Sequence, residues 1–219
     1  MRIVSIDIGY KNFCLYVEDH DISIYEAMQC PMKTHECDGS PSPEMKCILK
    51  ELFRNGKTVY HDNVDISRDA DSLNDICYNM YKYLTSIKNI LKDCEYVVIE
   101  QQLSRNVKAF KLAQTCASFF IFEFENKMNV VDFPAFHKTC VLGAPRTLKV
   151  AKNGKRKWKT LSKSERKKWS VKKALEILQC RDEKDTLDNI KTKRKKDDLA
   201  DTITMCQAFK FIFFVKNKQ

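Results

Sequence analysis

Four acidic residues stand where two predicted strands end and where the last predicted helix begins. Asp7 lies near the end of a strand over Arg2–Ile8, and Glu100 closes a later strand. Asp198 and Asp201 are three residues apart, so they lie on one face of the last helix. Because ligands of open α/β sheets bind at the carboxyl ends of the strands, we expect these carboxylates to converge. Carboxylate oxygens are the ligands that Mg²⁺ prefers in proteins.

Each acid also has an ordinary structural interpretation. An Asp at the start of a helix caps it and complements its dipole, which accounts for one of Asp197 and Asp198. Asp201 is harder to explain in this way, because it falls inside the apolar pattern of the helix and a buried unpaired carboxylate is costly. Together the four acids predict a site for two divalent ions about 3.5–4 Å apart, an arrangement that hydrolyses phosphodiesters.

The chain has 219 residues and a formal net charge of +10, which favours a polyanionic partner such as nucleic acid. Residues 138–196 hold 21 Lys or Arg and 6 Asp or Glu, whereas the other 160 residues hold 18 and 23. This stretch contains Trp158 and Trp169 and is flanked by apolar segments, so we interpret it as a phosphate-binding insertion rather than a solvated tail. We expect a single domain over residues 1–219 with a basic insertion at about 138–196.

Other features exclude several classes of protein. The longest apolar run is far too short to cross a bilayer, and Asp7 interrupts the apolar stretch that an export signal needs, so we expect no membrane partner and no secretion. The ten cysteines are scattered without a Cys-x-x-Cys pair, which indicates reduced thiols. The four histidines have no zinc-ligand spacing, and His137 alone is a candidate for contact with phosphate.

Hydrophobic periodicity predicts the order of the elements. The chain opens with three short strands, at Arg2–Ile8, Phe13–Val17 and Ile22–Ala27, joined as antiparallel hairpins. Residues 29–70 are predicted to be irregular apart from a short helix near Glu44–Phe53. The later predicted strands are Glu95–Glu100 and Asn129–Phe133, and the later helices are Asp71–Leu91, Asn106–Glu125, Ser164–Gln179 and Asp198–Val215. This order predicts an α/β fold with a mixed five-stranded sheet, three antiparallel strands and then parallel strands, flanked by helices.

Four ordered motifs run through these elements. They are Asp7-Ile8-Gly9-Tyr10-Lys11-Asn12, Ile99-Glu100-Gln101-Gln102, Ala109-Phe110-Lys111-Leu112-Ala113-Gln114 and Asp198-Leu199-Ala200-Asp201. The set resembles the motif series of RuvC-type Holliday junction resolvases, which belong to the RNase H-like superfamily. The glycine turn and the Lys-Lys-Asp-Asp-Leu-Ala-Asp segment look closest to the poxvirus branch. The resemblance covers the first strands, the central helices and the last helix, and it is weak over residues 29–70 and the basic insertion.

The resemblance implies roles for particular residues. Asp7, Glu100, Asp198 and Asp201 would bind two Mg²⁺ ions, for which Mn²⁺ can substitute, with Asp7 as the shared ligand. A basic catalytic residue is expected between the last strand and the last helix. Lys167 and Lys168 are the best matches, and of these two we assign Lys168 to catalysis and Lys167 to DNA contact. Leu103 is either an ordinary loop residue or a side chain placed at a branch point. The expected DNA contacts are Lys11, Asn12, Gln101, Gln102, Arg105, Lys155, Arg156, Lys157, Lys167, Lys195 and Lys196.

The implied reaction is attack of water on a phosphodiester, with no covalent intermediate, leaving a 5′-phosphate and a 3′-hydroxyl. On a four-way DNA junction, a two-fold homodimer would place two active sites on two strands that are cut symmetrically. The poxvirus resemblance also implies work on joined viral genomes in the cytoplasm of an infected cell. Two alternatives stay open: another RNase H-like nuclease, such as one acting on RNA–DNA hybrids, and an inactive nucleic-acid-binding module of the same fold.

Overall fold

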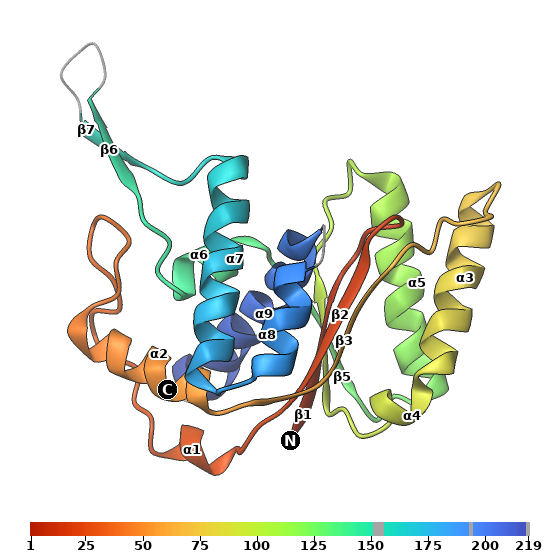
Figure 1. The fold of residues 1–219 in the computed structure, drawn as a ribbon, viewed down its shortest axis with the longest axis horizontal. Coiled ribbons are helices and arrows are strands. Elements are labelled where there is room, and N and C mark those ends of the chain that lie inside the picture. Colours follow the sequence, from red (N-terminus) through yellow and green to blue (C-terminus); the bar gives the residue numbers. More distant parts are fainter. Residues whose placement is uncertain (151–155, 193–194, 218–219) are drawn as a thin grey trace.

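A five-stranded sheet forms the centre of the molecule (Figure 1) in a computed structural model that describes residues 1–150, 156–192 and 195–217. Its strands are β1 (Arg2–Asp7), β2 (Phe13–Asp19), β3 (Lys57–Val64), β4 (Tyr96–Glu100) and β5 (Asn129–Phe133), in the spatial order β3-β2-β1-β4-β5. The first three strands pair antiparallel, whereas β4 runs parallel to β1 and β5 runs parallel to β4. The expected mixed sheet is confirmed, and β1, β4 and β5 end at one edge.

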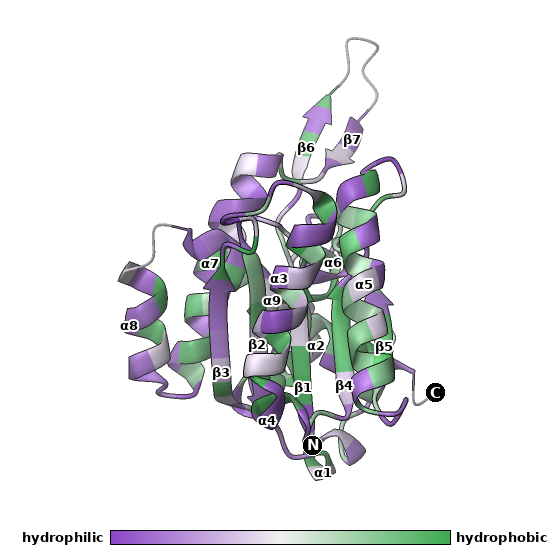
Figure 2. Cartoon of the chain, turned by 90° about the vertical axis from the view of Figure 1, so that its right-hand side faces the viewer, coloured by the Kyte–Doolittle hydropathy of each residue, from purple (hydrophilic) through white to green (hydrophobic). Residues whose placement is uncertain are grey.

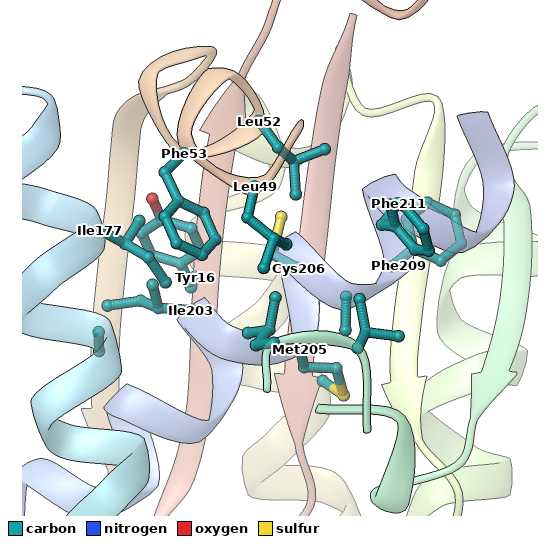
Figure 3. Packing of buried hydrophobic residues seen from close by; sticks show 14 of the residues in the cluster. Tyr16, Leu49, Leu52, Phe53, Ile177, Ile203, Met205, Cys206, Phe209 and Phe211 are labelled. Atoms are coloured by element: carbon teal, nitrogen blue, oxygen red, sulfur yellow. The ribbon is translucent and has the colours of Figure 1, made fainter. Parts of the chain in front are cut away.

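Helices cover both faces of this sheet (Figures 1 and 2). One face carries α3 (Leu73–Ser86), α4 (Lys88–Leu91) and α5 (Val107–Glu123). The other carries α2 (Pro43–Arg54), α7 (Lys163–Cys180) and α9 (Lys196–Lys210), and α8 (Lys184–Thr192) packs against α7 and α9. A short π-helical turn, Phe211–Lys216, continues α9. Figure 3 shows the core of this second layer, where Tyr16 of β2 lies among apolar side chains of α2, α7 and α9.

Most predicted helices are confirmed, with local capping that explains their starts. Ser72 caps α3 and shares a capping box with Asp75. The last helix is core: Phe209, Phe211 and Phe214 are buried. All ten cysteines are free thiols. No helix in the described ranges is both long and apolar enough to cross a membrane.

The predicted third strand at Ile22–Ala27 is wrong. That segment forms the short helix α1 (Ser23–Glu26), started by Asp21, whose side chain accepts hydrogen bonds from the Ser23 backbone and hydroxyl. The third strand is β3, inside the stretch predicted to be irregular. β3 is an edge strand of mostly half-exposed side chains, so its sequence lacks the apolar run of a central strand.

The basic insertion contains structure that the sequence pattern did not reveal. It begins within α6 (Phe136–Val141) and includes α8 and two short antiparallel strands, β6 (Thr147–Val150) and β7 (Arg156–Lys159). We call this pair the β6–β7 ribbon. It projects from the body beyond the edge where β1 and β4 end (Figures 1 and 2).

A buried cluster of charged and polar side chains connects β2 with α9 and with Arg181, the residue that follows α7. Glu18 of β2 accepts hydrogen bonds from Arg181 (2.7 Å), Lys210 (2.6 Å), Gln207 (2.8 Å) and Tyr16 (2.8 Å). Although burial opposes ionisation of Glu18, the charges of Arg181 and Lys210 hold its pKa well below the usual range. Glu18 therefore stays ionised, and its hydrogen bonds to Gln207 and Lys210 hold α9 against β2.

Candidate active site

Strand alternation aims Asp7 and Glu100 at the same side of the sheet. In β1, Ser5 donates a hydrogen bond to the Thr202 carbonyl of α9 (2.8 Å), so Asp7, two residues further, also faces α9. In β4, Val98 packs in the core beneath α9, which places Glu100 on that side as well. Because β1 and β4 are parallel neighbours, the two carboxylates end side by side.

The first turns of α9 bring Asp198 and Asp201 to the same edge. Asp201 accepts a hydrogen bond from Ser170 Oγ of α7 (2.6 Å), and that hydroxyl lies 3.2 Å from Thr204 Oγ1. The Asp198 and Asp201 side chains keep 18% and 28% of their surface exposed, so a ligand from solvent can reach both. The expected convergence of the four acids is what the fold produces.

Lys138 is the cation at the centre of these acids. Its Nζ donates to Glu100 Oε2 (2.7 Å) and lies 3.4 Å from Asp201 Oδ2, with the side chain 8% exposed. It projects from α6, which directly follows β5. Burial lowers the pKa of Lys138, but attraction to the neighbouring carboxylates outweighs it, so its pKa is raised and the ammonium is retained.

A second cation, Lys167, lies beside the acids at the start of α9. Lys167 of α7 forms an ion pair with Asp197 and lies 4.0 Å from Asp198 Oδ1. Burial opposes ionisation of Asp197, but the hydrogen bond from Lys167 prevails and lowers its pKa. Asp197 therefore has a local partner. The expected capping of the helix by this residue is wrong, because Lys195 is the N-cap and makes no side-chain capping hydrogen bond, whereas Asp197 lies within the first turn. Lys168, the residue assigned to catalysis, is exposed on the next position of α7.

Burial and repulsion between neighbouring carboxylates both raise the pKa of two of the four acids, Asp7 and Asp198, and burial is the larger cause. The pKa of Asp7 is raised well above its ordinary value by burial and then by the charge of Glu100, with smaller repulsion from Asp201 and Asp198. Burial and the neighbouring Asp197 raise the pKa of Asp198. At formal charges, the four carboxylates face two ammonium groups, Lys138 beside Glu100 and Asp201 and Lys167 beside Asp198, so the site still has an excess of negative charge.

The donor set fits hard divalent cations in type and charge, because all four side chains offer oxygen and their negative charge is undercompensated. Within the described ranges, no three acidic, His or Cys side chains surround a common point at ligand distance. The ammonium of Lys138 lies between Glu100 and Asp201 and contacts both. Binding of a cation by these two carboxylates would therefore compete with Lys138.

A cavity of about 200 Å³ opens beside the acids. Its lining includes Glu100, Lys138 and Asp201. The amino-terminal half of α7 adds the cations Lys163, Arg166 and Lys167 to the lining. A cavity lined by cations next to the acids suits a phosphodiester, whose oxygens need positive neighbours.

Several expected DNA contacts lie at this edge. Lys11 and Asn12 form the β1–β2 turn, where Gly9 is required because a Cβ there would lie 2.7 Å from the Asn12 carbonyl. The loop after β4 holds the exposed Gln101, Leu103 and Arg105, and Gln102, whose amide donates to the Glu100 carbonyl (3.1 Å). Lys195 and Lys196 are exposed at the start of α9, and Arg156 and Lys157 are exposed on β7. Lys155 lies outside the described residues.

Sequence reasoning missed Lys138. The signal that could have found it was position, because it follows the last strand of the sheet by only five residues and lies on the segment that crosses the site. The neighbouring His137 was singled out instead. Its ring packs against Phe136 (4.2 Å between centroids) and Phe133 (5.1 Å), and burial lowers its pKa.

The fold is that of RuvC-type Holliday junction resolvases. Thermus thermophilus RuvC matches over 96% of this chain and 94% of its own, with a TM-score of 0.54 and 13% identity. The fowlpox virus resolvase, in a complex with substrate Holliday junction DNA, matches over 95% and 96%, with a TM-score of 0.53 and 17% identity. The resemblance found in the four motifs is thus confirmed at the level of the fold.

In sequence, the chain is similar to two viral proteins. It is 36% identical to "Uncharacterized protein 170L" of Invertebrate iridescent virus 6 over an alignment of 235 residues, covering 96% of this chain and 89% of that protein. It is 24% identical to "Uncharacterized protein 97L" of Invertebrate iridescent virus 3, covering 94% and 98%. The chain belongs to the family of iridescent virus protein 170L. No protein-family model matches it.

Proposed function

We propose that the protein is a metal-dependent endonuclease that resolves four-way DNA junctions by paired, symmetric cuts. The observation that carries this proposal is the convergence of four carboxylates and Lys138 at the edge of a sheet with the RuvC fold. Two solved relatives of this fold, RuvC and the fowlpox enzyme, are described as bound to Holliday junction substrates.

Asp7, Glu100, Asp198 and Asp201 would hold two Mg²⁺ ions, with Mn²⁺ as a substitute. Such ions activate water and neutralise charge on the transferred phosphate. The fold positions these carboxylates: Asp7 and Glu100 stand at the ends of two paired strands, and Ser170 holds Asp201 by a hydrogen bond. The proposed products carry a 5′-phosphate and a 3′-hydroxyl, and no side chain forms a covalent intermediate.

We assign the basic residue of the mechanism to Lys138 in place of Lys168. Lys138 is buried among the acids, whereas Lys168 is exposed on α7. An ammonium released from Glu100 by an incoming cation would lie close enough to bind a non-bridging phosphate oxygen. Lys167 and the cavity cations on α7 would hold the flanking backbone.

We propose a homodimer, because a four-way junction presents two symmetric strands. The outward face of α5 supports this with exposed apolar side chains, including Val107 (56%), Phe110 (40%) and Phe122 (81%). Sedimentation of Phe122→Glu should show a monomer, with Ile22→Glu as a control that removes an equally apolar, half-exposed side chain on α1. A dimer of unchanged affinity in Phe122→Glu would reject this face.

The test of the proposed function compares substrates. The protein is incubated in Mg²⁺ with an end-labelled four-way junction, a linear duplex and an RNA–DNA hybrid of the same sequence. We expect paired nicks at the branch point of the junction and little cutting of the other two. Equal cutting of the hybrid would favour a hybrid nuclease, and binding of the junction without cutting by the native chain would favour an inactive binding module.

The biological setting is also a proposal. Relatives in two iridescent viruses support a viral protein that acts on joined genomes in an infected cell, and we predict the cytoplasm as the place. Imaging of the tagged protein in infected cells, alongside labelled viral DNA, tests this.

A further inference from the structure

The β6–β7 ribbon has two chemically different faces, and both are exposed. Its register pairs Leu148 with Trp158 and Lys149 with Lys157. Directly paired residues in an antiparallel ribbon share a face, and successive residues alternate. One face is therefore apolar, and the other is cationic. The apolar face carries Leu148, Trp158 and Val150 with Arg156, and the cationic face carries Lys149, Lys157 and Lys159 with Thr147.

Neither the exposed apolar side chains nor the opposed lysines of the ribbon stabilise the folded protein. Leu148, Val150 and Trp158 keep 45%, 64% and 39% of their surface exposed. Lys149 stands directly opposite Lys157, and like charges in that position destabilise a strand pair. Two short strands on their own are marginally stable in water. An anionic partner with an apolar surface would offset both costs.

The sequence around the ribbon shows the same bias. Residues 146–163 contain eight Lys or Arg and no Asp or Glu. This charge matches a polyanion and argues against an ordinary protein partner, whose surface would need acids. Nucleic acid offers both required surfaces, phosphates for the lysines and base faces for the ring of Trp158, and it is the proposed substrate of the nearby candidate active site.

The root of the ribbon is held firmly. The Arg146 backbone donates a hydrogen bond to the Asp38 carbonyl (2.6 Å). Gly39 packs so closely that a Cβ there would lie 2.4 Å from the Ala144 carbonyl. The turn over residues 36–41 therefore braces the ribbon, which gives a role to part of the segment that the sequence left unexplained.

The ribbon lies on the same side of the molecule as the candidate active site. It stands beyond the sheet edge that carries the acids (Figures 1 and 2). β7 leads within a few residues into α7, whose first turns carry Lys163 and Lys167 of the cavity wall. A DNA strand crossing the cavity and continuing past α7 would reach the ribbon.

We propose that the β6–β7 ribbon grips branched DNA with both faces. The lysine face lies along a phosphate backbone, and Trp158 with Leu148 packs on a base face that the branch point leaves unstacked. This inference rests on the proposed junction-resolving function and adds to it an element that recognises the branch. Nucleic-acid-binding proteins combine basic surfaces with aromatic rings that stack on bases, and some insert apolar side chains between base steps.

The test measures binding in EDTA, so that it does not depend on cleavage. Fluorescence anisotropy with a four-way junction and with a linear duplex compares the native chain, Trp158→Ala and Trp158→Phe. We expect Trp158→Ala to weaken junction binding by roughly 10-fold, the loss of one base-stacking contact, with little change for duplex. Trp158→Phe should retain most of the affinity, because the ring remains. A 2-aminopurine at the branch should be quenched more strongly by the native chain than by Trp158→Ala, because the native ring stacks on its face.

The lysine face is tested separately. Lys149→Gln with Lys157→Gln should weaken junction and duplex alike and reduce the salt dependence of log K by about 1.8, for two lost phosphate contacts. The matched control is Lys92→Gln with Lys127→Gln, which removes two lysines at the opposite end of the sheet and should leave the slope unchanged.

Three results would overturn the inference. The first is that Trp158→Ala binds the junction as tightly as the native chain, and the second is that it loses equal affinity for junction and duplex. The third is that Trp158→Ala changes the self-association of the protein, which would make the apolar face a protein interface. Failure of the proposed function is distinguishable, because it appears as absent cleavage in Mg²⁺ while these binding measurements still report on the ribbon.

Discussion

Lys138→Gln removes the ammonium that lies between Glu100 and Asp201. In the native chain that ammonium is 2.7 Å and 3.4 Å from the two carboxylates, with its side chain 8% exposed. Removing one partner of a buried ion pair costs about 3–5 kcal/mol. Because Glu100 and Asp201 remain 19% and 28% exposed, we expect the lower limit, a loss of about 3 kcal/mol in the free energy of unfolding measured in EDTA.

Mg²⁺ should reverse much of this loss. In the native chain a cation at Glu100 and Asp201 must displace Lys138, whereas in Lys138→Gln these carboxylates have no such competitor. The increase in the free energy of unfolding on adding Mg²⁺ should therefore be larger in the variant than in the native chain. Cleavage should nevertheless fall by at least about 100-fold, the effect of losing one preorganised charge at the phosphate.

The assay is urea denaturation with and without Mg²⁺, together with single-turnover cleavage of a labelled junction. Lys163→Gln is the matched control, since Lys163 lines the same cavity from α7. The idea that Lys138 and the cation share one pair of carboxylates makes two predictions for Lys138→Gln. It would be refuted if the variant unfolds in EDTA with the same free energy as the native chain and gains no more than the native chain on adding Mg²⁺.

Three further outcomes follow from the structure. Asp198→Asn should abolish cleavage while Asp197→Asn retains most of it, because Asp197 is already paired with Lys167; equal loss in single-turnover assays would argue against this division. The pKa of His20 is lowered to about 3 by burial and by Lys210, so the unfolded chain binds its proton more readily. The free energy of unfolding should then fall by up to about 1.4 kcal/mol per unit as pH drops from about 6.5 toward 3, and His20→Phe, whose ring fits against Tyr25, should show a shallower urea-measured slope. Lys210→Met should lower the melting temperature by roughly 6–12 °C in calorimetry, since about 3 kcal/mol is lost when Glu18 loses a buried partner. Glu18→Gln added to it should lower the melting temperature further, because the buried Arg181 then loses the charge of its partner.

Much of the sheet was predictable because its central strands are buried. The central strands β1, β2 and β4 have apolar runs or alternation strong enough to identify, and the carboxyl ends of β1 and β4 located Asp7 and Glu100. β3 was not predicted, for the opposite reason. It is an edge strand that exposes polar side chains, so its conformation depends on pairing with β2 and its sequence lacks a recognisable hydrophobic pattern.

The acids of the site were predictable and their cation was not. Carboxylates at strand ends are unusual in a sequence and attract notice, whereas a lysine in a strongly basic stretch does not. Lys138 differs from Lys168 through burial, which depends on α6 folding back over β4 and α9. The ribbon was hidden in the same way, since eight cations around it conceal the alternation of Leu148, Val150 and Trp158.

The central claim is that Asp7 and its neighbouring acids cut a DNA junction through bound metal. Asp7→Asn changes the charge of one ligand with little change in shape, so it tests that claim most directly. With Mg²⁺ and an end-labelled four-way junction, the native chain should make paired nicks at the branch, and Asp7→Asn should make none while binding the junction with native affinity in EDTA. Native cleavage by Asp7→Asn would contradict the account.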